Sequence, residues 1–140
     1  MNPTEKNRAI VTDIMSALAW GDTRPFSEAM ADDFTWRTMA VEGPWCGALR
    51  GRAEVGEFFA ALYRQFAARQ ATIADRIFAD GDTVIVEAKG GGVTTKRGER
   101  YANKYCLLFH LENGKLVEVR EYLDTAYANT RLDPIPMSPA

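Results

Sequence analysis

Glu121 is the residue best placed to move a proton, because it is a carboxylate flanked by aliphatic residues on its own face of a predicted strand. Its neighbours alternate with the period of a strand, which puts Val119, Glu121 and Leu123 on one face. Such a carboxylate reaches water at a sheet edge, pairs with Arg37 or Arg120, or lines a pocket. In a pocket, burial raises its pKa towards neutrality, where a carboxyl group can act as a general acid or base.

Two further polar residues lie on a strand that the alternating pattern predicts for Tyr101–Leu111. Asn103 and Tyr105 fall on its apolar face. The Asn-Gly pair at 113–114 then predicts a hairpin turn, since both residues tolerate a positive φ. We expect Asn103 to orient the Glu121 carboxyl group and Tyr105 to donate a hydrogen bond to a substrate. These three residues are the candidate catalytic set.

The elements that must position this set are helices first and strands later. Three helices are predicted. The first is capped by Thr4 and ends at Gly21, and the other two span Pro25–Met30 and Arg52–Phe66. Strands are predicted at 34–39, 72–79 and 83–87 and in the hairpin, with a last helical turn at 125–130. This order is typical of an α+β fold. We expect a curved, mostly antiparallel sheet, wrapped around the three N-terminal helices, that leaves a cone-shaped cavity.

The inward positions of these elements predict the rest of the pocket. They are apolar or aromatic, with one threonine, and we expect them to bind the substrate: Ile14, Leu18, Trp36, Thr38, Phe59, Leu62, Tyr101, Val119 and Leu123. The expected ligand is therefore a small hydrophobic molecule.

Length and composition narrow the function classes. The 140 residues suit a single domain over 1–140. The net charge of −2, a pI near 5.5 and the lack of a basic run argue against nucleic acid as a partner. No apolar run approaches the roughly 20 residues of a membrane span, and the first residues lack the apolar segment of a signal peptide. We expect a cytoplasmic protein without a membrane partner.

Neither a metal nor a cofactor is expected. Cys46 and Cys106 lie far apart and the chain has one histidine, which disfavours a zinc site. The glycines at 90–92 have neither the spacing nor the following helix of a phosphate-binding loop. The tail over 131–140 holds three prolines without periodicity, so we expect it to be loose or packed against a partner.

The outer face of the predicted hairpin is too apolar for an ordinary exposed sheet face. Such a patch indicates an interface, and two-fold pairing is the commonest way to cover it. We therefore expect a homodimer through the outer sheet face, which carries Cys106, Leu108, His110, Leu116, Arg120 and Tyr122.

Three segments, taken in order, resemble the nuclear-transport-factor-2-like superfamily in its SnoaL-like, ketosteroid isomerase-related branch. They are Leu18–Asp22 followed by Met30–Thr35, then Gly51-Arg52, and finally Asn113–Leu116 leading into Arg120–Asp124. The resemblance covers residues 5 to 130. It implies the cone-shaped fold, and relatives of this kind often form dimers.

The chemistry that the resemblance implies carries over only in part. The aspartate base of ketosteroid isomerases falls at Thr38, and their oxyanion tyrosine falls near Ile14. The Arg-x-Asp pair of limonene epoxide hydrolases falls near Ala88 and Gly90. Steroid isomerisation and epoxide opening of the known types are therefore not expected. Glu121 matches the later aspartate of those hydrolases and the acid–base aspartate of SnoaL-like cyclases.

Three functions remain open. The first is a small enzyme of the isomerase, cyclase or hydrolase type, in which a buried Glu121 transfers a proton on an oxygenated hydrophobic substrate. The second is a non-catalytic protein that binds a hydrophobic ligand in the same cavity, since one fold hosts many functions. The third is an interaction protein whose sheet face mainly forms a dimer.

Overall fold

A computed structural model describes residues 2–140, which form four helices and eight strands. The helices are α1 (Pro3–Leu18), α2 (Arg24–Ala29), α3 (Gly51–Tyr63) and α4 (Thr125–Arg131). The strands are β1 (Met30–Thr38), β2 (Gly47–Arg50), β3 (Thr72–Asp80), β4 (Thr83–Gly90), β5 (Val93–Thr94), β6 (Arg100–Tyr101), β7 (Lys104–Glu112) and β8 (Lys115–Leu123).

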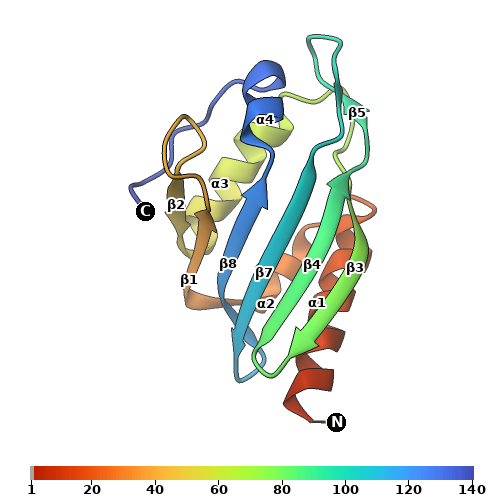
Figure 1. Ribbon diagram of the computed structural model, residues 1–140, viewed down its shortest axis with the longest axis vertical. Helices are drawn as coiled ribbons and strands as arrows, with labels where there is room; N and C mark the ends of the chain where they lie inside the picture. Colours follow the sequence, from red (N-terminus) through yellow and green to blue (C-terminus); the bar gives the residue numbers. More distant parts are fainter. Residues whose placement is uncertain (1) are drawn as a thin grey trace.

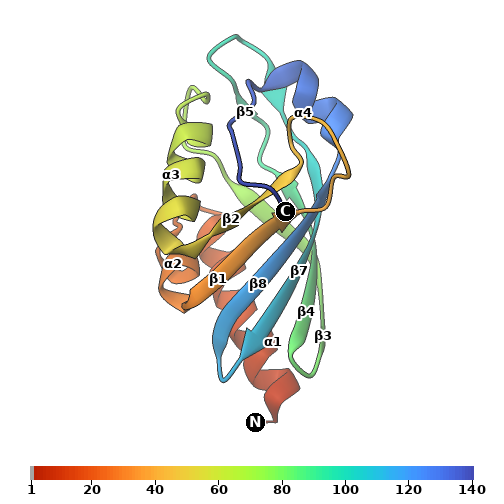
Figure 2. The same ribbon diagram turned by 90° about the vertical axis from the view of Figure 1, so that its left-hand side faces the viewer.

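A six-stranded sheet in the order β2-β1-β8-β7-β4-β3 forms one layer of the fold (Figure 1). All its neighbouring strands are antiparallel except β1 and β8, which are parallel. Helices α1, α2 and α3 cover one face of this curved sheet and leave the other face open, as the turned view shows (Figure 2). The α+β prediction, with a curved sheet around N-terminal helices, is confirmed. No helix of residues 2–140 is both long and apolar enough to cross a membrane.

The first helix is capped two residues earlier than the sequence predicts. The Asn2 side chain accepts a hydrogen bond from the backbone N–H of Glu5 at 2.9 Å, and Pro3 occupies the first turn, where its missing N–H costs nothing. Thr4, the predicted cap, instead accepts a hydrogen bond from the backbone N–H of Gly81 at 2.9 Å. This contact ties α1 to the turn between β3 and β4.

The hairpin of β7 and β8 forms as predicted, with positive φ at both Asn113 and Gly114. A bulge then shifts the register, because Leu111 pairs with Leu116 whereas His110 pairs with Glu118. The extra residue turns Leu116 inward, where it is fully buried. Its predicted place on the outer face was therefore wrong.

Two segments near the cavity differ from the sequence prediction. The strand predicted from Tyr101 onward is interrupted, so that Tyr101 belongs to β6 and pairs with Val93, while β7 begins at Lys104. The C-terminal tail, expected to be loose or packed against a partner, lies beside β2 of its own chain (Figure 2). Ala48 and Ser138 exchange two backbone hydrogen bonds of 2.8 and 3.1 Å, so the tail extends the sheet beyond β2.

Candidate active site

A cavity of about 350 Å³ lies between the inner face of the sheet and the helices. Aromatic rings form much of its wall, because α3 presents Phe58, Phe59 and Tyr63 towards Trp36 of β1. The Trp36 and Phe59 rings meet edge to face with their centroids 5.1 Å apart. The cavity is therefore suited to a hydrophobic molecule.

Most of the residues predicted to form the pocket line this cavity: Leu18, Trp36, Thr38, Phe59, Leu62, Tyr101, Tyr105, Glu121 and Leu123. Ile14 and Val119 do not, because both lie in the core with almost no exposed surface. They support the cavity wall from behind.

Asn103 is not part of the cavity lining either. Its buried amide group is fully engaged: Nδ2 donates to the Tyr101 hydroxyl at 2.8 Å and to the Asp124 carbonyl at 3.0 Å. Its Oδ1 accepts from the backbone N–H of Lys104 at 2.7 Å. Asn103 therefore joins β7 to the start of α4, and the geometry does not support the predicted role of orienting Glu121.

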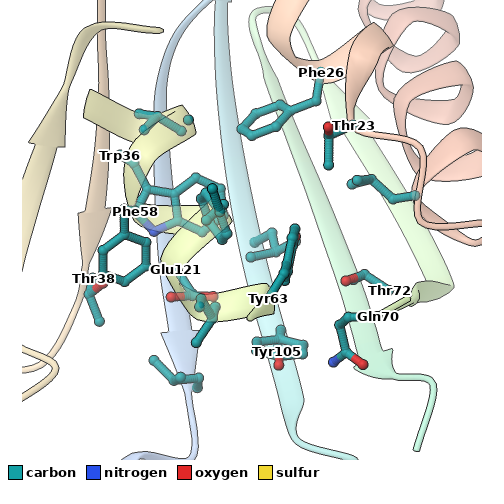
Figure 3. Close-up of a pocket in the computed structure, with 18 of the residues that line it drawn as sticks. Thr23, Phe26, Trp36, Thr38, Phe58, Tyr63, Gln70, Thr72, Tyr105 and Glu121 are labelled. Carbon is teal, nitrogen blue, oxygen red and sulfur yellow. The ribbon is translucent and has the colours of Figure 1, made fainter. Parts of the chain in front are cut away.

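Glu121 projects from β8 into the cavity, beside Trp36 and opposite Tyr63 (Figure 3). Its backbone is fixed by β1, since Thr38 is its register partner and the N–H of Met39 donates to its carbonyl at 2.8 Å. The side chain is half-buried, because part of its surface borders the cavity that the protein encloses. Burial raises the pKa of Glu121 to about 7, and the Trp36 indole N–H offsets only part of this rise.

No cation lies within ion-pair distance of the Glu121 carboxylate anywhere in residues 2–140. The two arginines considered as its partners, Arg37 and Arg120, both bind Glu118 instead, at 2.7 and 2.8 Å. Burial acts to raise the pKa of Glu118, but these two arginines outweigh it and lower the pKa. Of the three settings that the sequence left open for Glu121, the structure shows the pocket.

Two phenols accompany the carboxyl group. Burial, reinforced by the negative charge of Glu121, raises the pKa of Tyr63 to about 12. Burial also raises the pKa of Tyr105 well above its usual value, with contributions from Tyr101 and Glu121. Both phenols therefore stay protonated at neutral pH and can donate hydrogen bonds.

Sequence reasoning missed Tyr63 as a site residue. Its only signal is its place four residues after Phe59 on α3, which puts the two side chains on neighbouring turns of the same helix face. Their rings lie 5.8 Å apart in the structure.

Two buried polar atoms of the cavity wall have no hydrogen-bond partner in residues 2–140. They are Nε1 of Trp45, in the connection between β1 and β2, and Oε1 of Gln70, just before β3. Buried polar atoms are nearly always paired in folded proteins. Both residues are therefore candidates for contact with a ligand.

Metal-ligating side chains do not converge within residues 2–140, where no group of three or more His, Cys, Asp or Glu residues could hold an ion. Cys46 and Cys106 are free thiols. His110 lies away from the cavity lining, with its Nε2 3.6 Å from a carboxylate oxygen of Glu112.

Solved structures share this fold over nearly the whole chain. A putative SnoaL-like polyketide cyclase from Jannaschia sp. CCS1 is 19% identical, with 97% of each chain covered and a TM-score of 0.76. An NTF2-like protein of unknown function from Burkholderia pseudomallei is 24% identical, covering 86% of this chain and 92% of its own, with a TM-score of 0.74. TerC, crystallised with polyporic acid, is 19% identical, covering 89% and 96%, with a TM-score of 0.76.

A search of curated proteins found no match. The family model described as the SnoaL-like domain matches residues 11–119, which include the second half of α1, all of α2 and α3 and most of the sheet. This match confirms the resemblance seen in the sequence. The chain belongs to the SnoaL-like domain family.

Proposed function

We propose that this protein is a small-molecule enzyme in which Glu121 transfers a proton on a hydrophobic, oxygenated substrate. The observation that carries the proposal is the Glu121 carboxyl group, which borders an apolar cavity without a cation and has a pKa of about 7. Both protonation states are then populated near neutral pH, which is the condition for general acid–base catalysis. The reaction types that fit are isomerisation, cyclisation and hydrolysis.

The simplest step is proton removal from a carbon next to a carbonyl group. The Glu121 carboxylate takes the proton and becomes a neutral carboxylic acid, while the electron pair of the C–H bond forms a C=C bond and the π pair of the C=O bond moves onto the carbonyl oxygen. Tyr105 and Tyr63, which stay protonated, would donate hydrogen bonds to that oxygen. Glu121 then returns the proton to another carbon of the enolate, or the enolate carbon attacks a second carbonyl group to close a ring and Glu121 returns the proton to the alkoxide that forms.

A carbon acid with an apolar ring, nitrobenzisoxazole, tests the proposal without knowledge of the natural substrate. Removal of its ring proton by a carboxylate breaks the N–O bond and releases a coloured cyanophenolate. The wild type should accelerate this reaction above buffer, and Glu121→Gln should abolish the acceleration because an amide cannot accept the proton. Glu118→Gln is the matched control and should keep the rate, since Glu118 is not part of the cavity lining. Equal rates for wild type and Glu121→Gln would contradict the proposal.

The second candidate is a non-catalytic protein that binds a hydrophobic ligand. It is favoured by the isolation of Glu121, because Thr38 supplies no second acid or base beside it and Asn103 is engaged elsewhere. TerC, of the same fold, was crystallised with a ligand. Native mass spectrometry of the purified protein should then show a retained small molecule, together with a benzisoxazole rate equal to that of buffer.

We further propose a homodimer through the open face of the sheet. Tyr122 and Phe78 on this face are 45% and 44% exposed, and Leu108 lies between their strands, on β7. The register aligns Leu108 with Ile85 of β4 and Ile85 with Phe78 of β3, so an apolar row crosses these three strands, and Tyr122 on β8 lies opposite Cys106 of β7. Light scattering should give twice the mass of 15.6 kDa, and Leu108→Glu should halve it. A monomer at high concentration would rule this out.

The expected cytoplasmic location stays a proposal. It is supported by the two free cysteines, Cys46 and Cys106, which a reducing compartment would preserve. Cell fractionation with an antibody against the protein would test it.

A further inference from the structure

Gln70 lines the cavity and carries a buried polar atom that no other group of the described chain uses. The residue is 8% exposed, and its Oε1 is buried without a hydrogen-bond partner in residues 2–140. Leaving such an oxygen unpaired is unfavourable, because it loses its hydrogen bonds to water without gaining others. A methionine or leucine would fill the same space without that cost, so a structural role does not explain the amide.

The fold makes room for this amide. Thr72 lies two residues after Gln70, and its register partner on β4 is Gly90. A Cβ atom at Gly90 would lie 3.3 Å from Nε2 of Gln70, closer than ordinary contact. The glycine thus leaves space over β4, and Gln70 places a polar group there. Figure 3 shows Gln70 and Thr72 together on one side of the cavity.

Glu121 lies on the other side, with Tyr105 and Tyr63 between it and Gln70 (Figure 3). Strand β8, which carries Glu121, is separated from β3 by β7 and β4. Three interstrand spacings amount to about 14 Å along the sheet. The wall in between is mainly apolar or aromatic, so the cavity has two polar ends and a hydrophobic middle.

We propose that Gln70 and Thr72 form a second polar subsite, which binds a hydroxyl group at the end of the substrate remote from Glu121. A hydroxyl group suits both partners, because it donates to the Gln70 carbonyl oxygen and accepts from an amide N–H or the Thr72 hydroxyl. The substrate class is then an elongated hydrophobic molecule with oxygen functions at both ends. Only the statement that the Glu121 end is the reacting end rests on the proposed function.

The test uses two rigid rod-shaped probes, para-hydroxybiphenyl and para,para′-dihydroxybiphenyl, with dissociation constants from calorimetry. The second hydroxyl should tighten binding to the wild type about five- to tenfold, the gain of one net hydrogen bond. Gln70→Met should reduce this preference to within about twofold. A factor of about two remains because the symmetric diol can bind in two equivalent orientations. In a nitrogen–proton correlation spectrum, the Gln70 side-chain amide signals, assigned by their loss in Gln70→Met, should shift with the diol and not with the mono-ol.

Gln65→Met is the matched control. Gln65 is fully paired outside the cavity, since its Nε2 donates to the Asp133 carbonyl at 2.9 Å and its Oε1 accepts from the Asp133 N–H at 2.7 Å. This variant should lower Tm and keep the preference for the diol. Gln70→Met should lose the preference without a lower Tm, because the atom removed has no partner.

Three results would overturn the subsite: no preference for the diol in the wild type, a preserved preference in Gln70→Met, or no binding of either probe. The outcome is independent of turnover. A wild type that prefers the diol but does not react with nitrobenzisoxazole would refute the enzyme and leave the subsite standing. A wild type that reacts with nitrobenzisoxazole but shows no preference for the diol would refute the subsite and leave the enzyme standing.

Discussion

Glu118 and Glu121 lie three residues apart on β8 and point to opposite faces of the sheet, where their carboxylates meet opposite surroundings. Glu118 on the open face accepts from the Nε atoms of Arg37 at 2.7 Å and Arg120 at 2.8 Å. Glu121 borders the cavity without a cation in residues 2–140. The alternation of the strand therefore assigns the arginines to one carboxylate and leaves the other with a pKa near neutrality.

Glu121→Gln should stabilise the protein at high pH. The pKa of Glu121 rises from 4.5 to about 7 on folding. Since the folded pKa is the higher one, the wild type loses stability as pH climbs from the unfolded value through the folded value. The loss is about 3 to 3.5 kcal/mol at full ionisation, and a neutral glutamine does not incur it. Urea unfolding at about pH 4 and pH 8 should give similar stabilities at the lower pH and a more stable variant at the higher.

Glu118→Gln gives the opposite sign and serves as the control for this measurement. The folded pKa of Glu118 is lowered, so its ion pairs stabilise the fold above the unfolded pKa, and that contribution is lost as pH falls. The variant should therefore be less stable than the wild type at neutral pH. Parallel pH profiles for wild type and Glu121→Gln would show that Glu121 is not the group that titrates.

The benzisoxazole reaction should depend on pH through the same group. Only the Glu121 carboxylate accepts a proton, so kcat/KM should rise with pH and level off above the pKa of about 7. A midpoint near 4.5, the ordinary value for a glutamate, would mean that the carboxyl group is solvated and would remove the basis of the mechanism.

Gly56→Ala should stabilise the protein by about 0.5–1 kcal/mol, because a glycine within a helix is less favourable than alanine by that amount. Gly56 lies within α3, and a Cβ atom there meets nothing within 4 Å. Gly51 has equally open surroundings but a φ of +83°. Gly51→Ala should therefore destabilise, and thermal melts of the two variants should move in opposite directions. Shifts of the same sign would contradict the helix geometry at one of the two positions.

Removal of residues 136–140 should lower the free energy of unfolding by about 1–3 kcal/mol, from two backbone hydrogen bonds and lost packing. Ser138 pairs with Ala48, and Met137 accepts a contact from the Thr38 hydroxyl at 3.8 Å. Hydrogen exchange at the Ala48 amide should accelerate in the truncated protein, whereas the Leu111 amide, bonded to Asp82, should keep its protection relative to the rest of the fold. Unchanged exchange at Ala48 would show that the tail does not pair in solution.

The helices, the hairpin and the inward direction of Glu121 follow from local patterns, so they could be predicted from the sequence. The inward direction of Leu116 could not be predicted. One bulge residue reverses which sheet face the preceding side chains of the strand point to, and no alternation pattern shows a bulge. Asn103 was assigned to the correct face, yet its hydrogen bonds go to Tyr101 and Asp124. Alternation fixes the side on which a side chain lies, and the partners it finds there depend on tertiary structure.

Gln70 illustrates the other limit. It belongs to an irregular connection with no periodicity, and its place in the cavity depends on the missing side chain of Gly90 on another strand. Tyr63 follows the helical spacing of Phe59, but an aromatic residue that only packs in the core and one that serves the site have the same spacing. Gln70 and Tyr63 can be identified as site residues only when the burial of each polar group is known.

The pairing of Ser138 with Ala48 has a consequence for solubility. Strand β2 has only four residues and lies at one edge of the sheet, where free N–H and C=O groups would invite a strand from another molecule. The C-terminal segment occupies that edge in its own chain. A substitution that displaced the C-terminal segment would expose the edge of β2 as a template for aggregation, without changing Glu121.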